Sequence, residues 1–241
     1  MNDQSGHSGM PRCFDPKFSI LPPAQREIWE HLRPAAALGL VLYGGTAIAL
    51  QLGHRVSVDF DFFSFEPLDK AELQAKFSFL PDAERLQDSP DTLVVSARMP
   101  SGFVKLSFFG GMGFGRLHDP LQSSDRVMLV ASLDDLLATT LKTIHDRAEA
   151  KDYRDIAAML TAGISLPQGL ATFRAMFHGE PRTALLAIGY FGDGDIGSLT
   201  KTEKQTLISA RDRVRDLPEI SLIAGSLATA VTDCDDADRV F

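Results

Sequence analysis

The sequence lacks any run of about 18 or more apolar residues, the length that a helix needs to cross the hydrocarbon core of a bilayer. Its first residues, MNDQSGHSGMPRCFD, also lack the apolar stretch of a secretory signal peptide. Hydrophobic residues make up 44% and charged residues 23% of the chain, which is usual for a globular protein with its own core. We therefore expect a cytoplasmic protein that makes no contact with a membrane.

Cysteine is scarce, and basic residues are outnumbered by acidic ones. Cys13 and Cys234 lie near opposite ends of the 241 residues, without the close spacing of a zinc site or a disulfide framework, so we expect both to be free thiols. The formal net charge is −8. Because bulk electrostatic binding of nucleic acid needs a surplus of lysine and arginine, any contact with RNA must be local.

The two common nucleotide-binding signatures are absent from the glycine-rich turn Gly44-Gly45-Thr46, which is neither a P-loop nor a full G-x-G-x-x-G motif. This turn stands where a predicted buried strand, Leu38 to Tyr43, passes into a helix that should stop at Gly53. Glycine lets a phosphate approach the backbone, and free N–H groups at a helix start favour anions. We predict that the turn holds the phosphates of an NTP; a tight turn with Thr46 as an ordinary helix cap is the alternative.

Polar and apolar residues alternate from Arg55 to Phe63, the most informative segment of the chain. As a strand, this segment would place Ser57, Asp59 and Asp61 on one face. The opposite face would carry Val56, Val58, Phe60 and Phe62, anchored in a core. Carboxylates two residues apart on a strand lie about 6.6 to 6.8 Å apart at their Cα atoms and can converge on one Mg²⁺. A half-exposed strand whose acids merely face water is the alternative.

The remaining pattern predicts a two-part α+β architecture. Thr92 to Met99 and Phe103 to Phe109 read as two strands joined by a hairpin turn. From Ser132 onward the apolar spacing is helical nearly to the end of the chain. We therefore expect a sheet-containing lobe with an N-terminal extension over residues 1–125 and a helical lobe over residues 126–241.

Taken together, these motifs resemble a known family. Gly44-Gly45-Thr46 and the stretch His54-Arg55-x-Ser57-x-Asp59-x-Asp61-Phe62-Phe63 are similar to the signature of AbiEii/AbiGii-type nucleotidyltransferase toxins, of the polymerase-beta-like nucleotidyltransferase superfamily. Lys142 and the run Arg147-x-x-x-Lys151-Asp152-x-x-Asp155 are similar to the later lysine and K-D-x-x-D motifs of that family. The resemblance implies a nucleotidyltransferase lobe, a mixed sheet with flanking helices, followed by a helical C-terminal lobe.

The same resemblance implies an activity. NTP and Mg²⁺ would bind the first lobe, an acceptor hydroxyl would attack the α-phosphate, and pyrophosphate would leave. In better-understood relatives the acceptor is the 3′ end of tRNA. Such proteins generally act as toxins beside an antitoxin, which would be a protein partner of this chain.

Residue roles carry over from the family motif position by position. Asp59 and Asp61 would bind the metal, and Asp152, with Asp155 next in line, would act as base or orient the acceptor. Lys142 would neutralise phosphate charge in the transition state. The residues expected to contact the nucleotide are Gly44, Gly45, Thr46, Arg55, Ser57 and Lys142; Arg55 has the alternative of bracing an acid, and Ser57 that of accepting a nucleotide itself. A solvated helix face is the alternative for Lys142, Asp152 and Asp155.

The sequence departs from the superfamily at one point. Members commonly carry a third carboxylate on a later strand, where this chain has Ser107. Either metal loading is weaker or Asp152 substitutes. Two rival hypotheses follow: a nucleotide-binding protein that transfers nothing, and an enzyme whose acceptor is a hydroxyl on a protein.

Overall fold

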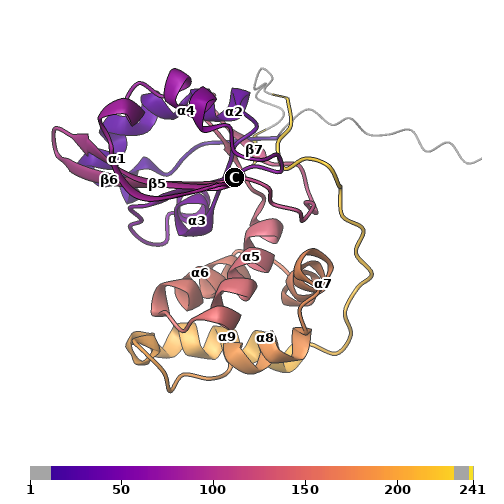
Figure 1. Cartoon of the computed structure of the whole chain (residues 1–241). Coiled ribbons are helices and arrows are strands. Elements are labelled where there is room, and N and C mark those ends of the chain that lie inside the picture. Colours follow the sequence, from indigo (N-terminus) through magenta and orange to yellow (C-terminus); the bar gives the residue numbers. More distant parts are fainter. Residues whose placement is uncertain (1–11, 231–238, 241) are drawn as a thin grey trace, which may run out of the picture.

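The computed structural model describes residues 12–230 and 239–240, and it divides into a sheet with flanking helices and a bundle of helices below it (Figure 1). This arrangement confirms the predicted α+β class. Within the described residues, no helix is both long and apolar enough to cross a membrane.

A single mixed sheet organises the upper part of the molecule, with strand order β4-β5-β6-β3-β2-β8-β7-β1-β9. The strands are β1 (Cys13–Phe14), β2 (Val41–Tyr43), β3 (Phe60–Phe63), β4 (Glu84–Ser89), β5 (Thr92–Met99), β6 (Gly102–Phe109), β7 (Leu121–Ser123), β8 (Leu129–Val130) and β9 (Arg239–Val240). β5 and β6 form the predicted hairpin. β3 lies between β2, which is antiparallel to it, and β6, which is parallel.

Helices cover both faces of this sheet (Figure 1). The helices α1 (Pro23–Ile28), α2 (Pro34–Ala37) and α4 (Lys70–Lys76) lie on the far face, and α3 (Gly44–Leu52) lies between the sheet and the helical bundle. α3 is rich in alanine, leucine and isoleucine that are buried, and it ends as predicted at Gly53, whose positive φ of 70° suits glycine.

The helical part consists of α5 (Leu133–Asp146), α6 (Ala150–Thr161), α7 (Leu166–Phe177), α8 (Pro181–Ile188) and α9 (Lys201–Arg213). α5 begins as predicted, because the Ser132 side chain accepts a hydrogen bond from the backbone N–H of Asp135. The division predicted at residues 125/126 falls between β7 and β8, which both belong to the sheet. The change from strands to helices therefore comes at Ser132.

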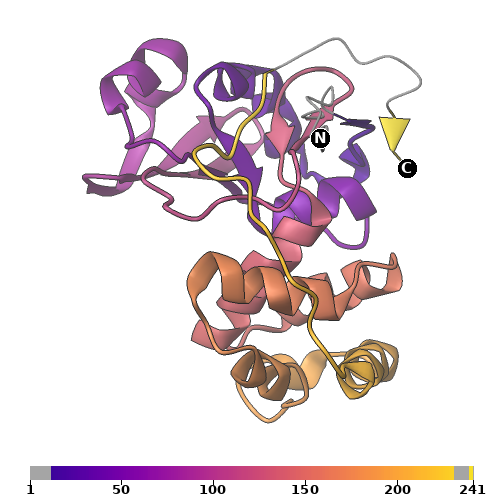
Figure 2. The same ribbon diagram turned by 90° about the vertical axis from the view of Figure 1, so that its right-hand side faces the viewer.

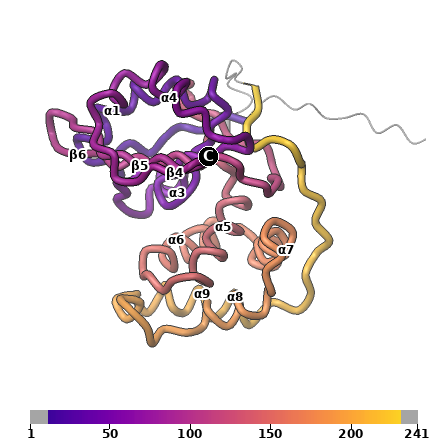
Figure 3. Tube along the Cα trace, in the orientation of Figure 1, coloured from indigo at the N-terminus to yellow at the C-terminus, as the bar shows by residue number. Residues whose placement is uncertain are grey.

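After α9 the chain returns to the sheet as an extended segment along the side of the helical bundle (Figures 2 and 3). Backbone hydrogen bonds in both directions join Arg116 and Ile223, and β9 pairs with β1. Cys13 on β1 is buried and disulfide-bonded, so the prediction of a free thiol is wrong for Cys13; Cys234 lies outside the described residues. The spacing of cysteines along a chain does not show which segments meet in the fold, so the prediction failed for Cys13.

β3 is shorter than the predicted strand and begins only at Phe60. Phe60 and Phe62 are buried, in ring contact with Trp29 and Phe108 respectively. The expectation that Val56 and Val58 share this core is wrong, since they are 60% and 46% exposed. The alternating pattern of polar and apolar residues thus begins before the strand itself.

Candidate functional site

A cleft of about 780 Å³ opens between the sheet and the helices α5 and α6. This volume is within the range of small-molecule sites, about 300 to 1,000 Å³. The predicted site residues that line it are Gly44, Gly45, Thr46, Arg55, Ser57, Asp59, Asp61, Asp152 and Asp155. Lys142 is not part of this lining. The fold thus brings together two motifs that are about a hundred residues apart in the sequence.

Asp61 lies in the middle of the sheet, in register with Tyr43 on β2 and Ser107 on β6. Burial raises the pKa of Asp61, and the charge of Asp59 raises it further, whereas a hydrogen bond from Ser107 and the charge of Lys105 act in the opposite direction. Asp59 is half-exposed just before β3, and the Lys105 ammonium lies 3.9 Å from its Oδ2 atom. The two carboxylates therefore carry negative charge that their surroundings do not fully compensate.

The carboxylate oxygens in this part of the cleft are suitable ligands for a divalent cation. Among the described residues there is no cluster of three or more histidine, cysteine or acidic side chains that could hold a metal. Mg²⁺ is commonly bound by one or two carboxylates together with phosphate oxygens of a substrate, so a pair of acids is sufficient. A cation here would also relieve the burial cost that raises the pKa of Asp61.

The glycine turn lies directly beside these acids. Gly44 has a φ of +73°, and a Cβ atom at this position would stand 3.0 Å from the Oδ2 atom of Asp61. The cap residue of α3 is Tyr43, which makes no side-chain cap hydrogen bond. The first N–H groups of a helix have no partner within the helix, so those of α3 are available to an anion beside Asp61.

Thr46 does not cap α3 and instead supports the neighbouring segment. Its buried hydroxyl lies 2.7 Å from the Ser57 hydroxyl and also donates to the carbonyl oxygen of Asp59. The alternative of Thr46 as an ordinary helix cap is therefore wrong. Residues 55–59 lie outside β3, and their polar atoms bind several other elements besides α3. The backbone N–H of Ser57 donates to the carbonyl oxygen of Ile20, and Gln25 Nε2 donates to the carbonyl oxygen of Val58.

The acids of α6 are buried, which excludes the alternative of a solvated helix face for Asp152 and Asp155. The Arg55 guanidinium donates from Nε and Nη2 to the two carboxylate oxygens of Asp155, each at 2.6 Å, and His54 Nε2 lies 2.6 Å from the same carboxylate. Asp152 lies 3.3 Å from Arg147 Nε. Burial raises the pKa of Asp152, and Arg147 opposes this shift.

Lys142 lies beside the cleft on α5. Its ammonium bonds the carboxylate of Asp146, which does line the cleft, and its side chain is half-exposed. Lys105 and Lys151 are the lysines of the lining. Sequence reasoning passed over Lys105, although the alternation of β6 places it on the same face as Ser107.

Sequence reasoning also missed an apolar rim on the sheet side of the cleft, formed by Val56, Val58 and Leu86. Leu86 is 51% exposed and lies on the edge strand β4, at a register shift between Arg85 and Gln87. Such bulges redirect side chains and are frequent near active sites. β4 gave no sequence signal because nearly all of its side chains are exposed.

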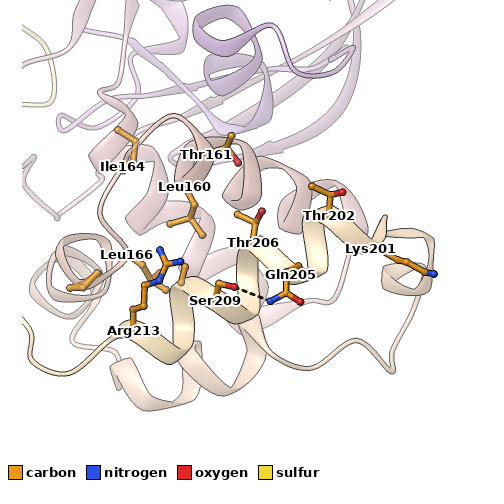
Figure 4. Close-up of a pocket in the computed structure, with 12 residues that line it drawn as sticks. Leu160, Thr161, Ile164, Leu166, Lys201, Thr202, Gln205, Thr206, Ser209 and Arg213 are labelled. Atoms are coloured by element: carbon orange, nitrogen blue, oxygen red, sulfur yellow. Dashed lines mark hydrogen bonds between the residues drawn. The ribbon is translucent and has the colours of Figure 1, made fainter.

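A second depression, of about 790 Å³, lies between α6 and α9 (Figure 4). Its sides are formed by aliphatic residues such as Leu160 and Ile164 and by polar residues of α9, with Lys201 and Arg213 toward its two ends. The described residues that line it include no carboxylate. The two depressions have similar volumes, but they differ in the side chains that line them. The acid-lined cleft is the candidate active site.

Comparisons with known proteins agree with this choice. The family model described as "Nucleotidyl transferase AbiEii toxin, Type IV TA system" matches residues 27–220. An uncharacterized protein of Aquifex aeolicus (strain VF5) is 31% identical over 138 residues, which cover 55% of this chain and 65% of that protein. The solved structure of MenT4, a nucleotidyltransferase toxin from Mycobacterium tuberculosis H37Rv, matches with a TM-score of 0.50 and 14% identity over 77% of this chain and 82% of that chain. At this identity the structural likeness shows a shared fold.

Proposed function

The chain belongs to the family of AbiEii nucleotidyltransferase toxins of type IV toxin–antitoxin systems, and we propose that it transfers a nucleoside monophosphate from an NTP to an acceptor hydroxyl in a Mg²⁺-dependent reaction. The observation that carries this proposal is the position of Asp59 and Asp61. Both carboxylates line the cleft beside the glycine turn, and the only ion pair to either of them among the described residues is the long one to Lys105.

Different residues of the cleft would bind the metal and the phosphates. Asp59 and Asp61 would hold Mg²⁺, which supplies positive charge to the reacting phosphates. The N–H groups at the start of α3 bind phosphate oxygens, and Lys105 and Lys151 add positive charge.

Asp152 is the candidate for the proton transfer. The acceptor hydroxyl oxygen bonds to the α-phosphorus, the bond from that phosphorus to the pyrophosphate oxygen breaks, and the hydroxyl proton passes to Asp152. Burial raises the pKa of Asp152, and a carboxylate of raised pKa is a better proton acceptor than a solvated one. In this proposal Lys142 acts on phosphate charge from beside the cleft, next to Asp146.

The acceptor that we propose is RNA, at the 3′ end of tRNA. The apolar rim of Val56, Val58 and Leu86 offers a surface against which unpaired bases can pack, and the lysines of the cleft suit a local contact with phosphate. This fits a chain with a net charge of −8, in which only local contacts with RNA are expected. A cytoplasmic location and a cognate antitoxin are further parts of the proposal.

The test is incubation of the purified protein with total tRNA, Mg²⁺ and each α-³²P-labelled NTP in turn, followed by separation of RNA from protein on a denaturing gel. We expect label on RNA that is lost with Asp59→Ala and kept with Asp212→Asn, which alters an exposed ion pair of α9. Label on protein would favour the protein acceptor. Binding of NTP without release of pyrophosphate would instead favour the binding protein that transfers nothing.

A further inference from the structure

Three parts of the proposed site meet at one carboxylate. Asp155 on α6 binds both His54 and Arg55, which directly precede the segment that carries Ser57 and Asp59. We propose that Asp155 is a positioning residue that holds the metal-binding segment, residues 54–59, against α6, and that it does not accept the proton of the acceptor hydroxyl. This inference rests on the proposed function.

The geometry of Asp155 leaves it little capacity for another partner. Its side chain is 2% exposed, and both of its carboxylate oxygens accept hydrogen bonds from the fork of Arg55. The Nδ1 atom of His54 is buried without a hydrogen-bond partner among the described residues, so Nε2 and its bond to Asp155 account for the polar contacts of that ring. Both oxygens of Asp155 are therefore occupied, whereas the one hydrogen bond to the Asp152 carboxylate among the described residues comes from Arg147 Nε at 3.3 Å.

The glycine turn is shaped around the same ion pair. A Cβ atom at Gly45 would stand 2.1 Å from Arg55 Nη2 and 3.0 Å from Asp155 Oδ2, so a larger residue would push the pair apart. Residues 44–45, residues 54–59 and α6 therefore share one point of contact. The elements expected to bind phosphate, metal and acceptor are held relative to one another by a buried, two-pronged ion pair.

The same contacts also indicate the role of Arg55. Burial alone would lower the pKa of Arg55, but the hydrogen bond and the charge of Asp155 outweigh this effect and raise it. Nε and Nη2 of Arg55 both donate to Asp155, and Nη1 donates to the carbonyl oxygen of Val56. Of the two roles that the sequence left open for Arg55, the structure therefore favours bracing an acid over binding a phosphate.

Amide hydrogen exchange of residues 54–59, followed by mass spectrometry on the full chain, tests the proposal without depending on activity. We compare Asp155→Asn and Arg55→Lys with Asp212→Asn, the same chemical change at an exposed arginine pair. Exchange in residues 54–59 should become about tenfold faster in the first two variants and stay unchanged in the third. Arg55→Lys keeps the charge but loses the fork, so it decides the question if Asp155→Asn does not fold.

Transfer kinetics give a second, separate readout. Misplacement of residues 54–59 should lower kcat roughly 10- to 100-fold in both variants, and the shape of the pH profile should stay that of the wild type because the proton acceptor is intact. Unchanged exchange in both folded variants would overturn the proposal, as would a strong loss of activity in Asp155→Asn together with full activity in Arg55→Lys. If the wild type transfers nothing, the proposed function fails while the exchange measurement still decides the role of Asp155.

Discussion

The two walls of the cleft carry the same kind of side chain in opposite electrostatic settings. On the sheet wall, the one ion pair of Asp59 or Asp61 among the described residues joins Asp59 to the Lys105 ammonium at 3.9 Å. On the α6 wall, Asp155 is bound by Arg55 and His54 at 2.6 Å, and Asp152 is paired with Arg147. The acids of the sheet wall therefore lack the close cations that the acids of α6 already have.

This difference indicates how the same residue type serves separate purposes in one site. A carboxylate without a close cation can take up a metal ion at little cost, because no close ion pair must be broken. A carboxylate that is already bonded on both oxygens fixes the relative position of the chain segments that it joins. We expect loss of activity when the first kind is changed and loss of stability when the second kind is changed.

The largest effect is expected for Asp59→Asn and Asp61→Asn. Either change removes a metal ligand, which should lower the transfer rate about 10³-fold or more. Stability should not fall, because burial disfavours the charge of Asp61 in the folded protein. The rate of NMP incorporation and the thermal midpoint of each variant measure both quantities; a variant with near-normal rate would remove that residue from the metal site.

Asp155→Asn tests the opposite wall. It leaves Arg55 and His54 without their buried partner, which should lower the free energy of unfolding by about 3 to 5 kcal/mol. Denaturant unfolding measures this value. An Arg55→Leu/Asp155→Leu double variant removes both charges and should be more stable than Asp155→Asn; equal stability would show that the unpaired charge is not the cause.

Lys142 and Lys151 distinguish what the family resemblance predicts from what the geometry of the cleft predicts. Lys151 lines the cleft, whereas Lys142 is bonded to Asp146 beside it. From geometry, Lys151→Gln should reduce kcat roughly 10- to 100-fold, since it removes positive charge close to the phosphates. Steady-state kinetics of Lys142→Gln decide the predicted role of Lys142: a comparable loss would support it, and a normal rate would leave Lys105 and Lys151 as the lysines of the site.

The smallest effect is expected at the apolar rim. Leu86→Ser changes an exposed side chain, so the free energy of unfolding should stay within about 0.5 kcal/mol of the wild-type value. The KM for the RNA acceptor should rise several-fold while the KM for NTP stays the same. Equal changes in both KM values would mean that the rim serves the nucleotide and not the acceptor.

Local patterns predicted much of the fold and the position of the acids. The hairpin of β5 and β6, the start of α5 at Ser132 and the end of α3 at Gly53 depend on turn and cap residues that are close in sequence. The resemblance to the AbiEii family was confirmed by the family match over residues 27–220. Such features need no knowledge of distant contacts.

The remaining features depend on contacts that no local pattern encodes. Arg55 and Asp155 are 100 residues apart, and neither side chain indicates its partner in the sequence. Val56 and Val58 continue the alternation of β3, but they lie before the strand, in a segment whose Ser57 binds Thr46 and Ile20. The disulfide bond of Cys13 could not be predicted either, because cysteine spacing does not show which segments meet in three dimensions.

Metal binding is the most direct test of the central claim, that the two carboxylates without close cations, Asp59 and Asp61, hold the metal. Mn²⁺ can replace Mg²⁺ as a paramagnetic probe, and electron paramagnetic resonance measures its free fraction in the presence of an NTP analogue that cannot react at the α-phosphate. We predict that the wild type and Asp152→Asn bind Mn²⁺ alike and that Asp59→Asn and Asp61→Asn lose this binding. Equal binding by all four proteins would contradict the account.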